Sequence, residues 1–326
     1  MSARPVRVSF VLLAWNHPEL EALAIASVLA QTDPHWQLLV VDNGSSPALA
    51  LPSQAQADAR VSLLRSESNL GFAAGMNLGL RVVDGELLVP LNGDVVLRED
   101  YVAELRRRYD QCVSEHIGAL APLVYRGTPE EPRGIESKGW YLRGRFSVIS
   151  DPEMTDGSEA FGGSGACGAY LAEAVRAVSP HEVFDSSYYA YGEDIDLHFR
   201  LHYAGWSCRY VASLVGWHRV SAYFGTSGSA LAAPANLQPY ILGNRVRNII
   251  KYLSWRDLLW FGPPIFVTEV GMLLSSFFLR RPPFSAYRRA YRAVWDDRAK
   301  LLAQRREVQR ARTMSSRALR ALVRGL

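Results

Sequence analysis

Residues 36–46 read Trp-Gln-Leu-Leu-Val-Val-Asp-Asn-Gly-Ser-Ser, an apolar run that stops abruptly at turn-forming residues. Because its apolar residues lack regular polar alternation, the run predicts a strand buried on both faces, as in a parallel sheet. Along the chain, predicted strands and helices alternate, with further strands expected at 6–14, 61–65 and 86–91 and helices at 18–30 and 72–83. Strands that alternate with helices over short connectors predict an α/β fold with a mostly parallel, Rossmann-like central sheet and right-handed crossovers.

Two of the predicted strands end in acidic turns, at Asp42 and at Asn92-Gly93-Asp94. In open α/β sheets, ligands bind outside the carboxyl ends of the strands. Asp94 is therefore a candidate ligand for a hard divalent cation, which needs one or two carboxylates plus substrate phosphates. Asp42 could accept hydrogen bonds from a base or a ribose, or it could serve only in an Asx-turn.

A glycine-containing segment, Asn69 to Gly79, follows the third predicted strand. Gly71 and Gly75 permit close backbone approach, and the N-terminus of the helix beyond them offers N–H groups to an anion or a ribose. Tight packing of that helix on the sheet would explain the glycines equally well. At the first helix, Asn16 is available as an N-terminal cap.

Acidic residues also open a predicted helix at 193–204, where Glu193 and Asp194 are adjacent. Two such acids are usually favourable partners of the helix dipole. A carboxylate is also what removes the proton from an attacking hydroxyl, and Asp194 fits that role better than Asp196. His218 could complete a metal shell with Asp94, or it could be a structural histidine.

The middle of the chain has little periodicity. Residues 125–168 predict long loops with a hairpin near 139–148, followed by a helix at 169–178 and a strand at 207–211. Cys112, Cys167 and Cys208 lie far apart, which favours reduced thiols in a cytosolic chain over a disulfide framework. The N-terminus shows no signal-peptide pattern, so the sequence favours a cytoplasmic protein.

The C-terminal part differs in character. A basic helix is expected at 240–252, an apolar segment at 255–279, and a polar, Arg-rich helix from 286. Arg256, Asp257, Pro263, Pro264 and Glu269 interrupt the apolar segment, so it predicts an interfacial or hairpin-like element rather than a spanning helix. A hydrophobic dimer or domain contact is the competing interpretation. Arginines crowded between 280 and 324 favour anionic lipid over nucleic acid.

Taken in order, these motifs resemble the family 2 glycosyltransferases, the inverting group with the GT-A fold, and especially its rhamnosyltransferase-like members. The resemblance covers roughly residues 6–223 and rests on five segments. These are Val40 to Ser46, Asn69 to Gly79, Leu91 to Val95, Gly163 to Cys167 and Tyr191 to Asp194. Asn92 departs from the Asp-x-Asp metal motif, which leaves Asp94 as the principal ligand.

The resemblance implies roles for individual residues. The donor nucleotide would contact Ala14, Asn16, Asp42, Asn69, Gly71, Phe72, Asn77 and Asn92. Gly165, Ala166 and Cys167 would lie near the diphosphate and the acceptor, and Asp94 with His218 would hold Mg²⁺ or Mn²⁺. Of the catalytic pair Glu193 and Asp194, the second would be the base.

The resemblance also implies an activity and partners. A dTDP- or UDP-linked sugar, with L-rhamnose favoured, would pass to a hydroxyl of a glycan or lipid-linked acceptor in cell-surface polysaccharide synthesis. A catalytic domain is expected at 1–235 and a helical extension at 236–326, which would contact the inner face of the cell membrane or a second subunit. No nucleic-acid partner is expected.

Two other functions fit a sheet with strand-end acids. A Mg²⁺-dependent nucleotidyltransferase would open with a Gly-rich, basic phosphate loop, whereas Ala14-Trp15-Asn16-His17-Pro18 follows the first strand here. A non-catalytic, sugar-nucleotide-binding descendant of the fold is the second alternative. Retention of Asp42, Asp94 and the Glu193-Asp194 pair argues against it.

Overall fold

The computed structural model describes residues 5–179, 181–219 and 234–324. Within them the chain forms two compact units. The first, here called the sheet unit, holds residues up to 140, 150–189 and 206–219 of the described part, and the second, the helical unit, holds 141–149, 190–205 and 234–324. A domain boundary after residue 235 stays a prediction.

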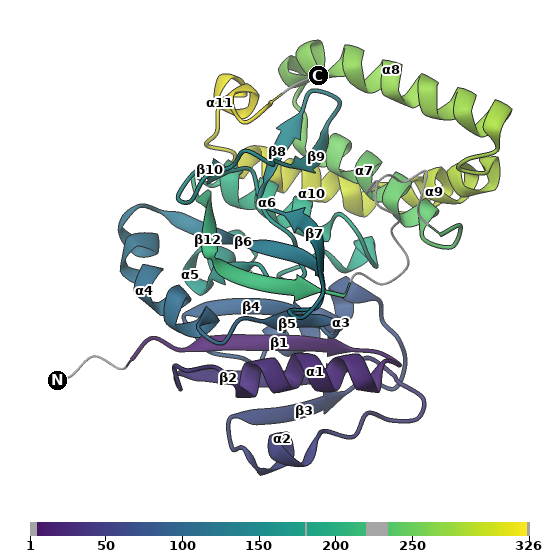
Figure 1. Cartoon of the computed structure of the whole chain (residues 1–326). Coiled ribbons are helices and arrows are strands. Elements are labelled where there is room, and N and C mark those ends of the chain that lie inside the picture. The colour runs from purple at the N-terminus through teal and green to yellow at the C-terminus, as the bar shows by residue number, and fades with distance from the viewer. Residues whose placement is uncertain (1–4, 180, 220–233, 325–326) are drawn as a thin grey trace. The chain divides into compact units, whose positions relative to one another are not determined.

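The sheet unit is built on one mixed sheet with the strand order β10-β12-β6-β11-β4-β1-β2-β3 (Figure 1). Strands β1 (Val8–Ala14), β2 (Trp36–Asp42), β3 (Val61–Arg65) and β4 (Leu87–Asn92) are mutually parallel, as predicted. β11 (Ala169–Leu171) lies antiparallel between β4 and β6 (Ile117–Gly127), and β12 (Ser207–His218) runs parallel to β6. Short strands β5 (Val95–Leu97), β7 (Pro132–Ser137) and β10 (Glu159–Ala160) complete it.

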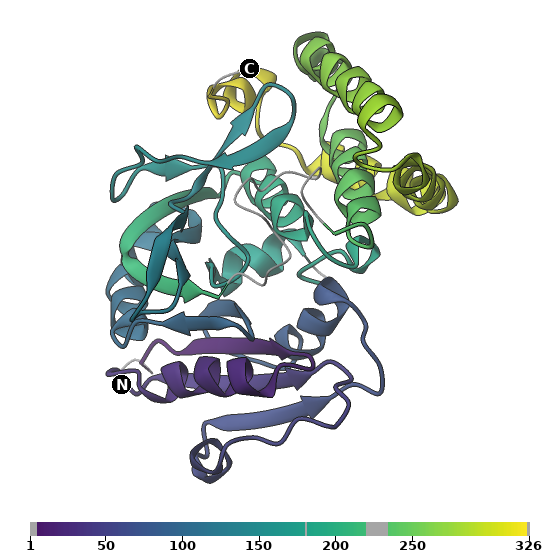
Figure 2. The same cartoon turned by 45° about the vertical axis from the view of Figure 1, so that its right-hand side comes forward.

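Helices pack on this sheet because each buries an apolar stripe. They are α1 (Pro18–Leu29), α2 (Ser53–Ala57), α3 (Phe72–Leu80), α4 (Tyr101–Ser114) and α5 (Ala172–Val178), with a short 3₁₀ turn, η1, at Ser186–Tyr188. Figure 2 shows α1 running along the β1–β2 part of the sheet. The α/β, GT-A-like fold expected from the sequence is confirmed, and the strands and helices up to residue 94 lie within a few residues of their predicted bounds.

Several local predictions were wrong. Residues 125–150 are mostly strands rather than long loops, with the expected hairpin present as β8 (Trp140–Arg143) and β9 (Ser147–Ser150), whereas residues 151–168 are irregular apart from β10. The helix predicted at 169–178 begins as strand β11. Asn16 does not cap α1: His17 is the N-cap residue, and the Asn16 Oδ1 accepts a hydrogen bond from the Ser46 N–H (2.8 Å) because Asn16 adopts φ +57°.

The helical unit contains α6 (Glu193–Tyr203), α7 (Gln238–Tyr252), α8 (Trp255–Leu279), α9 (Phe284–Asp296), α10 (Arg298–Ala311) and α11 (Ser316–Ala321). Its core is aromatic: the Phe199 ring stacks on Tyr252 at 4.5 Å and on Phe146 at 5.0 Å between centroids. The prediction of a single polar helix from residue 286 was wrong, since the three helices α9, α10 and α11 occupy that region.

α8 also differs from its prediction. The apolar segment was expected to be interrupted, yet it forms one continuous helix of 25 residues with Pro263 and Pro264 inside it. By length and composition alone α8 could cross a membrane, and almost none of its apolar window is buried. Charged residues in a sequence do not break a helix when they have partners, and Asp257 and Glu269 of α8 have such partners, as described below.

Candidate functional site

The first part of the site is a corner of the sheet unit where Asp94 and His218 meet. Asp94 follows β4 at its carboxyl end, and pairing of β5 with β12 sets His218 opposite Val95, the residue after Asp94. The His218 Nε2 is 3.1 Å from the Asp94 Oδ1, and its Nδ1 is 3.0 Å from the carboxylate of Glu136 on β7. The two candidate metal ligands are thus in contact, and metal binding by them stays a prediction.

The charge state of this corner follows from its contacts. Burial alone would lower the pKa of His218, but hydrogen bonds and charge from Asp94 and Glu136 outweigh it and raise that pKa to about 10. Without a cation, an imidazolium therefore bridges the two carboxylates. A bound divalent cation would replace the ring proton on Nε2 and supply the positive charge between the two carboxylates.

The geometry of the corner fits a divalent ion held by two protein ligands. Neighbouring ligands on an octahedral Mg²⁺ with bonds of ~2.1 Å are ~3 Å apart, which is close to the observed 3.1 Å between Nε2 and Oδ1. Glu136 accepts from the other ring nitrogen, as carboxylates behind metal-bound histidines do. No cluster of three or more His, Cys, Asp or Glu side chains suited to a metal occurs among the described residues, so phosphates and water would complete the shell.

Glu136 was missed in the sequence. It lies in a segment predicted to be loop, and its role depends on β7 pairing with β6, which in turn pairs with β12. No local pattern reveals such a relation.

Asp42 at the end of β2 has its carboxylate occupied by the protein itself. Oδ1 accepts from the Ser45 N–H (2.9 Å), Oδ2 accepts from the Leu49 N–H (3.0 Å), and Arg65 forms an ion pair with it. Burial raises the pKa of Asp42, but these hydrogen bonds and the Arg65 charge lower it overall. The Asx-turn interpretation accounts for these contacts, and a contact with the donor stays a prediction.

Asn43 ties the glycine segment to β2. Its Oδ1 accepts from the Leu70 N–H (3.0 Å), and its Nδ2 donates to the Gly71 carbonyl (3.1 Å) and to the Asn69 Oδ1 (3.2 Å). Gly71 has φ +81°, and a Cβ there would lie 2.4 Å from the Tyr189 ring. Only glycine fits this position.

The helix after Gly71 packs unusually close to the sheet. A Cβ on Gly75 would lie 2.9 Å from the Leu13 Cδ1, and one on Gly79 would lie 2.3 Å from the Val11 Cγ1, so packing on the sheet explains these two glycines. The Asn77 amide is engaged by Phe184, donating to its carbonyl (2.6 Å) and accepting from its N–H (3.0 Å). Phe72 contacts the Phe184 ring, with centroids 5.8 Å apart. Donor contacts of Phe72 and Asn77 stay predictions.

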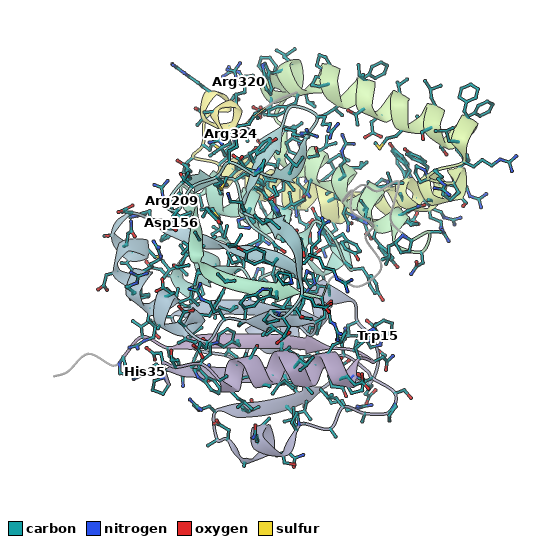
Figure 3. All side chains as sticks on the ribbon, in the orientation of Figure 1. Trp15, His35, Asp156, Arg209, Arg320 and Arg324 are labelled. Carbon is teal, nitrogen blue, oxygen red and sulfur yellow. The ribbon has the colours of Figure 1, made fainter. Side chains whose placement is uncertain are left out.

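The loop after β1 is fixed by a residue that sequence reasoning overlooked. Glu21 on α1 is buried, and its Oε1 accepts from the Trp15 N–H (2.6 Å) and the His17 N–H (3.2 Å). Burial raises the pKa of this carboxyl above its usual value. The loop carries Asn16 and begins at Ala14, whose carbonyl accepts from the Asn43 N–H (2.9 Å). Trp15 itself is exposed at the end of β1 (Figure 3).

The segment 165–167 is hydrogen-bonded to Asn92, two residues before Asp94. The Asn92 N–H donates to the Ala166 carbonyl (2.9 Å), and the Cys167 carbonyl accepts from the Tyr101 hydroxyl. Within the described residues the buried Asn92 Oδ1 has no hydrogen-bond partner. The Cys167 thiol is buried, which raises its pKa far above the usual range and leaves it an unreactive packing residue.

The acidic pair belongs to the helical unit, in the first turn of α6. Glu193 is buried, and burial together with the Asp194 charge raises its pKa well above the usual range. Asp194 is partly exposed and its Oδ1 accepts from the Ile195 N–H (2.8 Å). Asp196 is fully buried, with partners in Lys251, Arg200 (2.9 Å) and the Tyr252 hydroxyl (2.6 Å). Of the three acids, Asp194 is the one suited to meet a substrate.

Helix α7 holds the turn that precedes this pair. The Asn244 Nδ2 donates to the carbonyls of Ala190 (2.9 Å) and Tyr191 (2.7 Å), and the Asn248 Nδ2 donates to that of Gly192 (3.3 Å). Tyr191 has φ +67°, a costly conformation for a residue with a Cβ. A strained backbone persists only where its surroundings fix it, and α7 supplies that fixation.

A GT-A-like fold with acids at its strand ends is compatible with sugar transfer, and similarity in sequence to known proteins shows the family. Residues 9–177 match the family described as Glycosyl transferase family 2. Because that match covers about half of the chain, the protein belongs to glycosyl transferase family 2.

Individual relatives are distant. The UDP-Glc:alpha-D-GlcNAc-diphosphoundecaprenol beta-1,3-glucosyltransferase WfgD of Escherichia coli is 32% identical over 87 residues, which are 27% of this chain and 34% of WfgD. The uncharacterized glycosyltransferase YfnE of Bacillus subtilis is 25% identical over 66% of this chain and 65% of its own. The chain thus spans about a third of WfgD's length.

One solved structure supports the fold. A crystal structure of GalNAc-T7 with UDP, GalNAc and Mn²⁺ superposes with a TM-score of 0.57 at 14% identity, covering 80% of this chain and 50% of that one. At this identity the similarity concerns the fold alone.

Proposed function

We propose that the protein is a metal-dependent, inverting glycosyltransferase that moves a sugar from a nucleoside diphosphate donor to an acceptor hydroxyl. The observation that carries the proposal is the corner formed by Asp94, His218 and Glu136 at the carboxyl end of β4. Family membership supplies the reaction class. A divalent cation there, Mg²⁺ or Mn²⁺, would act as a Lewis acid on the departing diphosphate.

In this proposal Asp194 is the base. It accepts the proton of the acceptor hydroxyl while that oxygen attacks the anomeric carbon from the face opposite the diphosphate, so configuration inverts. Asp194 follows Tyr189 by five residues, and the Tyr189 carbonyl accepts from the Ala73 N–H of α3 (3.2 Å). Along the chain, the acid thus follows closely after a residue that is hydrogen-bonded to the donor segment. Burial and the charge of Asp194 raise the pKa of the neighbouring Glu193, which makes Glu193 the less suitable base of the two.

For the donor we propose a UDP- or dTDP-linked sugar, with glucose suggested by the name of WfgD and L-rhamnose by the motif resemblance. The acceptor would be a glycan or lipid-linked saccharide of cell-surface polysaccharide synthesis, since WfgD's name specifies a diphosphoundecaprenol substrate. Such acceptors place the protein at the cytoplasmic face of the membrane.

Donor binding and transfer should be measured separately. Thermal-shift assays with UDP and dTDP, each with and without Mn²⁺, should show stabilisation that depends on the cation. Asp94→Asn should remove that dependence, whereas Asp194→Asn should abolish transfer and leave nucleotide affinity within a few fold. Asp110→Asn, at an exposed position on α4, is the matched control. Equal loss of binding and transfer in Asp194→Asn would contradict the base role, and nucleotide binding without any transfer would favour a non-catalytic descendant.

A further inference from the structure

Helix α8 presents a continuous apolar surface to solvent. Its most exposed side chains, each about 70% accessible or more, are Leu259, Phe266, Val267, Phe277, Phe278 and Leu279. In Figures 1 and 2, α8 runs along the edge of the helical unit. An exposed apolar surface of this extent marks a site of interaction with a protein or a membrane.

The opposite face of α8 is fastened to the rest of the helical unit. Asp257 pairs with Arg312 (2.6 Å), and Glu269 pairs with Arg245 of α7 and accepts from the Tyr291 hydroxyl of α9 (3.2 Å). Between these two anchors, the Phe261 ring meets Phe146 edge-on. The helix is therefore held at its start and its middle by charged partners.

Positive charge gathers where α8 ends and α9 begins. Arg280 and Arg281 follow α8, and Arg288, Arg289 and Arg292 are exposed on α9. A groove of about 310 Å³ lies at the same turn, lined by Phe277, Phe284, Arg280, Ser276 and Pro283. Apolar rings beside guanidinium groups match the boundary between acyl chains and anionic head groups.

We infer that α8 lies in the plane of an anionic lipid bilayer, with its outer face in the acyl region and the arginines of the α8–α9 turn on the head groups. A second copy of the chain fits less well, because the acids that α8 could offer to a partner's arginines, Asp257 and Glu269, already pair with Arg312 and Arg245. The inference is independent of the proposed function.

The anchors of α8 distinguish lying in the membrane from crossing it. At 1.5 Å per residue, 25 residues extend ~37 Å, enough to span the ~30 Å hydrocarbon core. Spanning would place Glu269 near the middle of that core and separate it from Arg245, or take the Arg-rich helices α7 and α9 into lipid. An in-plane position keeps both ion pairs and buries only the outer face.

Vesicle flotation tests the inference. The full chain should float with vesicles containing phosphatidylglycerol, more weakly with pure phosphatidylcholine vesicles, and less at high salt. Phe277→Glu with Phe278→Glu should weaken binding at least tenfold, because two exposed rings lose their burial in lipid. Val82→Glu with Ile135→Glu, two exposed apolar residues of the sheet unit, is the matched control and should float like the wild type.

A further variant and a second measurement distinguish a lipid surface from a second copy of the chain. Arg280→Gln with Arg281→Gln and Arg288→Gln should abolish the preference for anionic vesicles. Unchanged flotation of the Phe277/Phe278 variant would overturn the inference. So would a change in sedimentation from dimer to monomer without any vesicle binding, because the face would then cover a second copy. Nucleotide-dependent thermal shifts should be the same in all these variants, which keeps the result distinct from that of the proposed function.

Cysteine accessibility tests the orientation. Arg256→Cys and Arg281→Cys place thiols at exposed charged positions beside the two ends of α8, outside the acyl region, while the three native cysteines are buried. In vesicle-bound protein, an impermeant maleimide added outside should label both ends if α8 lies in the plane. Protection of one end alone would show a spanning helix and overturn the in-plane arrangement.

Discussion

At the residue scale, the contacts of Glu136 indicate that it orients the His218 ring. It fixes the His218 ring through Nδ1 and so directs Nε2 toward Asp94. Glu136→Gln should lower Mn²⁺ affinity by about 10- to 100-fold, as loss of a carboxylate behind a metal-bound histidine does. Calorimetric Mn²⁺ titration measures this, with the exposed Glu131→Gln as control. Unchanged affinity would contradict a role for Glu136 in orienting a metal-bound His218.

Glu193 gives stability a pH dependence. Its pKa is raised in the folded protein, first by burial and then by Asp194, so folding favours the protonated form. This contribution is complete below the unfolded pKa near 4.5 and is lost as pH rises toward the folded pKa. Glu193→Gln should therefore stabilise the protein in urea unfolding at pH 8 and have little effect at pH 4. Equal effects at both pH values would contradict a raised pKa.

At the element scale, the contact of α3 with the sheet depends on Gly79. A methyl group there would meet Val11 and Val41, so Gly79→Ala should cost about 1–3 kcal/mol of unfolding free energy through overpacking. Gly262→Ala, inside α8 with open space around its Cβ, should instead stabilise by about 0.5–1 kcal/mol. Urea unfolding of both variants checks the contrast, and similar signs for the two would refute the packing explanation.

α7 sets the position of the turn before Asp194. Asn244→Ala removes two hydrogen bonds to that turn, and a small displacement of a reacting group can cost ~100-fold in rate. We expect kcat to fall by roughly that factor with KM nearly unchanged. Asn248→Ala, which loses one longer bond, should have a smaller effect. A fall explained wholly by a lower melting temperature would assign Asn244 a structural role only.

At the scale of the whole molecule, what the sequence revealed depended on how local the pattern was. The strands up to Asn92 are apolar runs with turn formers at their ends, and both features are read within a few residues. β6 and β7 are neighbours in sequence, but β12 pairs with β6 across about 90 residues, and only that distant pairing brings Glu136 to His218. α8 was misjudged because Asp257 and Glu269 look disruptive until Arg312 and Arg245 are seen beside them.

In the helical unit, helix α7 contacts both α8 and the turn before Asp194. Asn244 and Asn248 of α7 hold the turn before Asp194, while the neighbouring Arg245 grips Glu269 of α8. If α8 rests on lipid as inferred and Asp194 is the base as proposed, the hydrogen bonds of α7 would hold that carboxylate at one height above the bilayer. An acceptor anchored in the same leaflet would then react only if its free hydroxyl lies at the height of the carboxylate. The enzyme would thereby select acceptors by the number of sugars between the lipid and that hydroxyl.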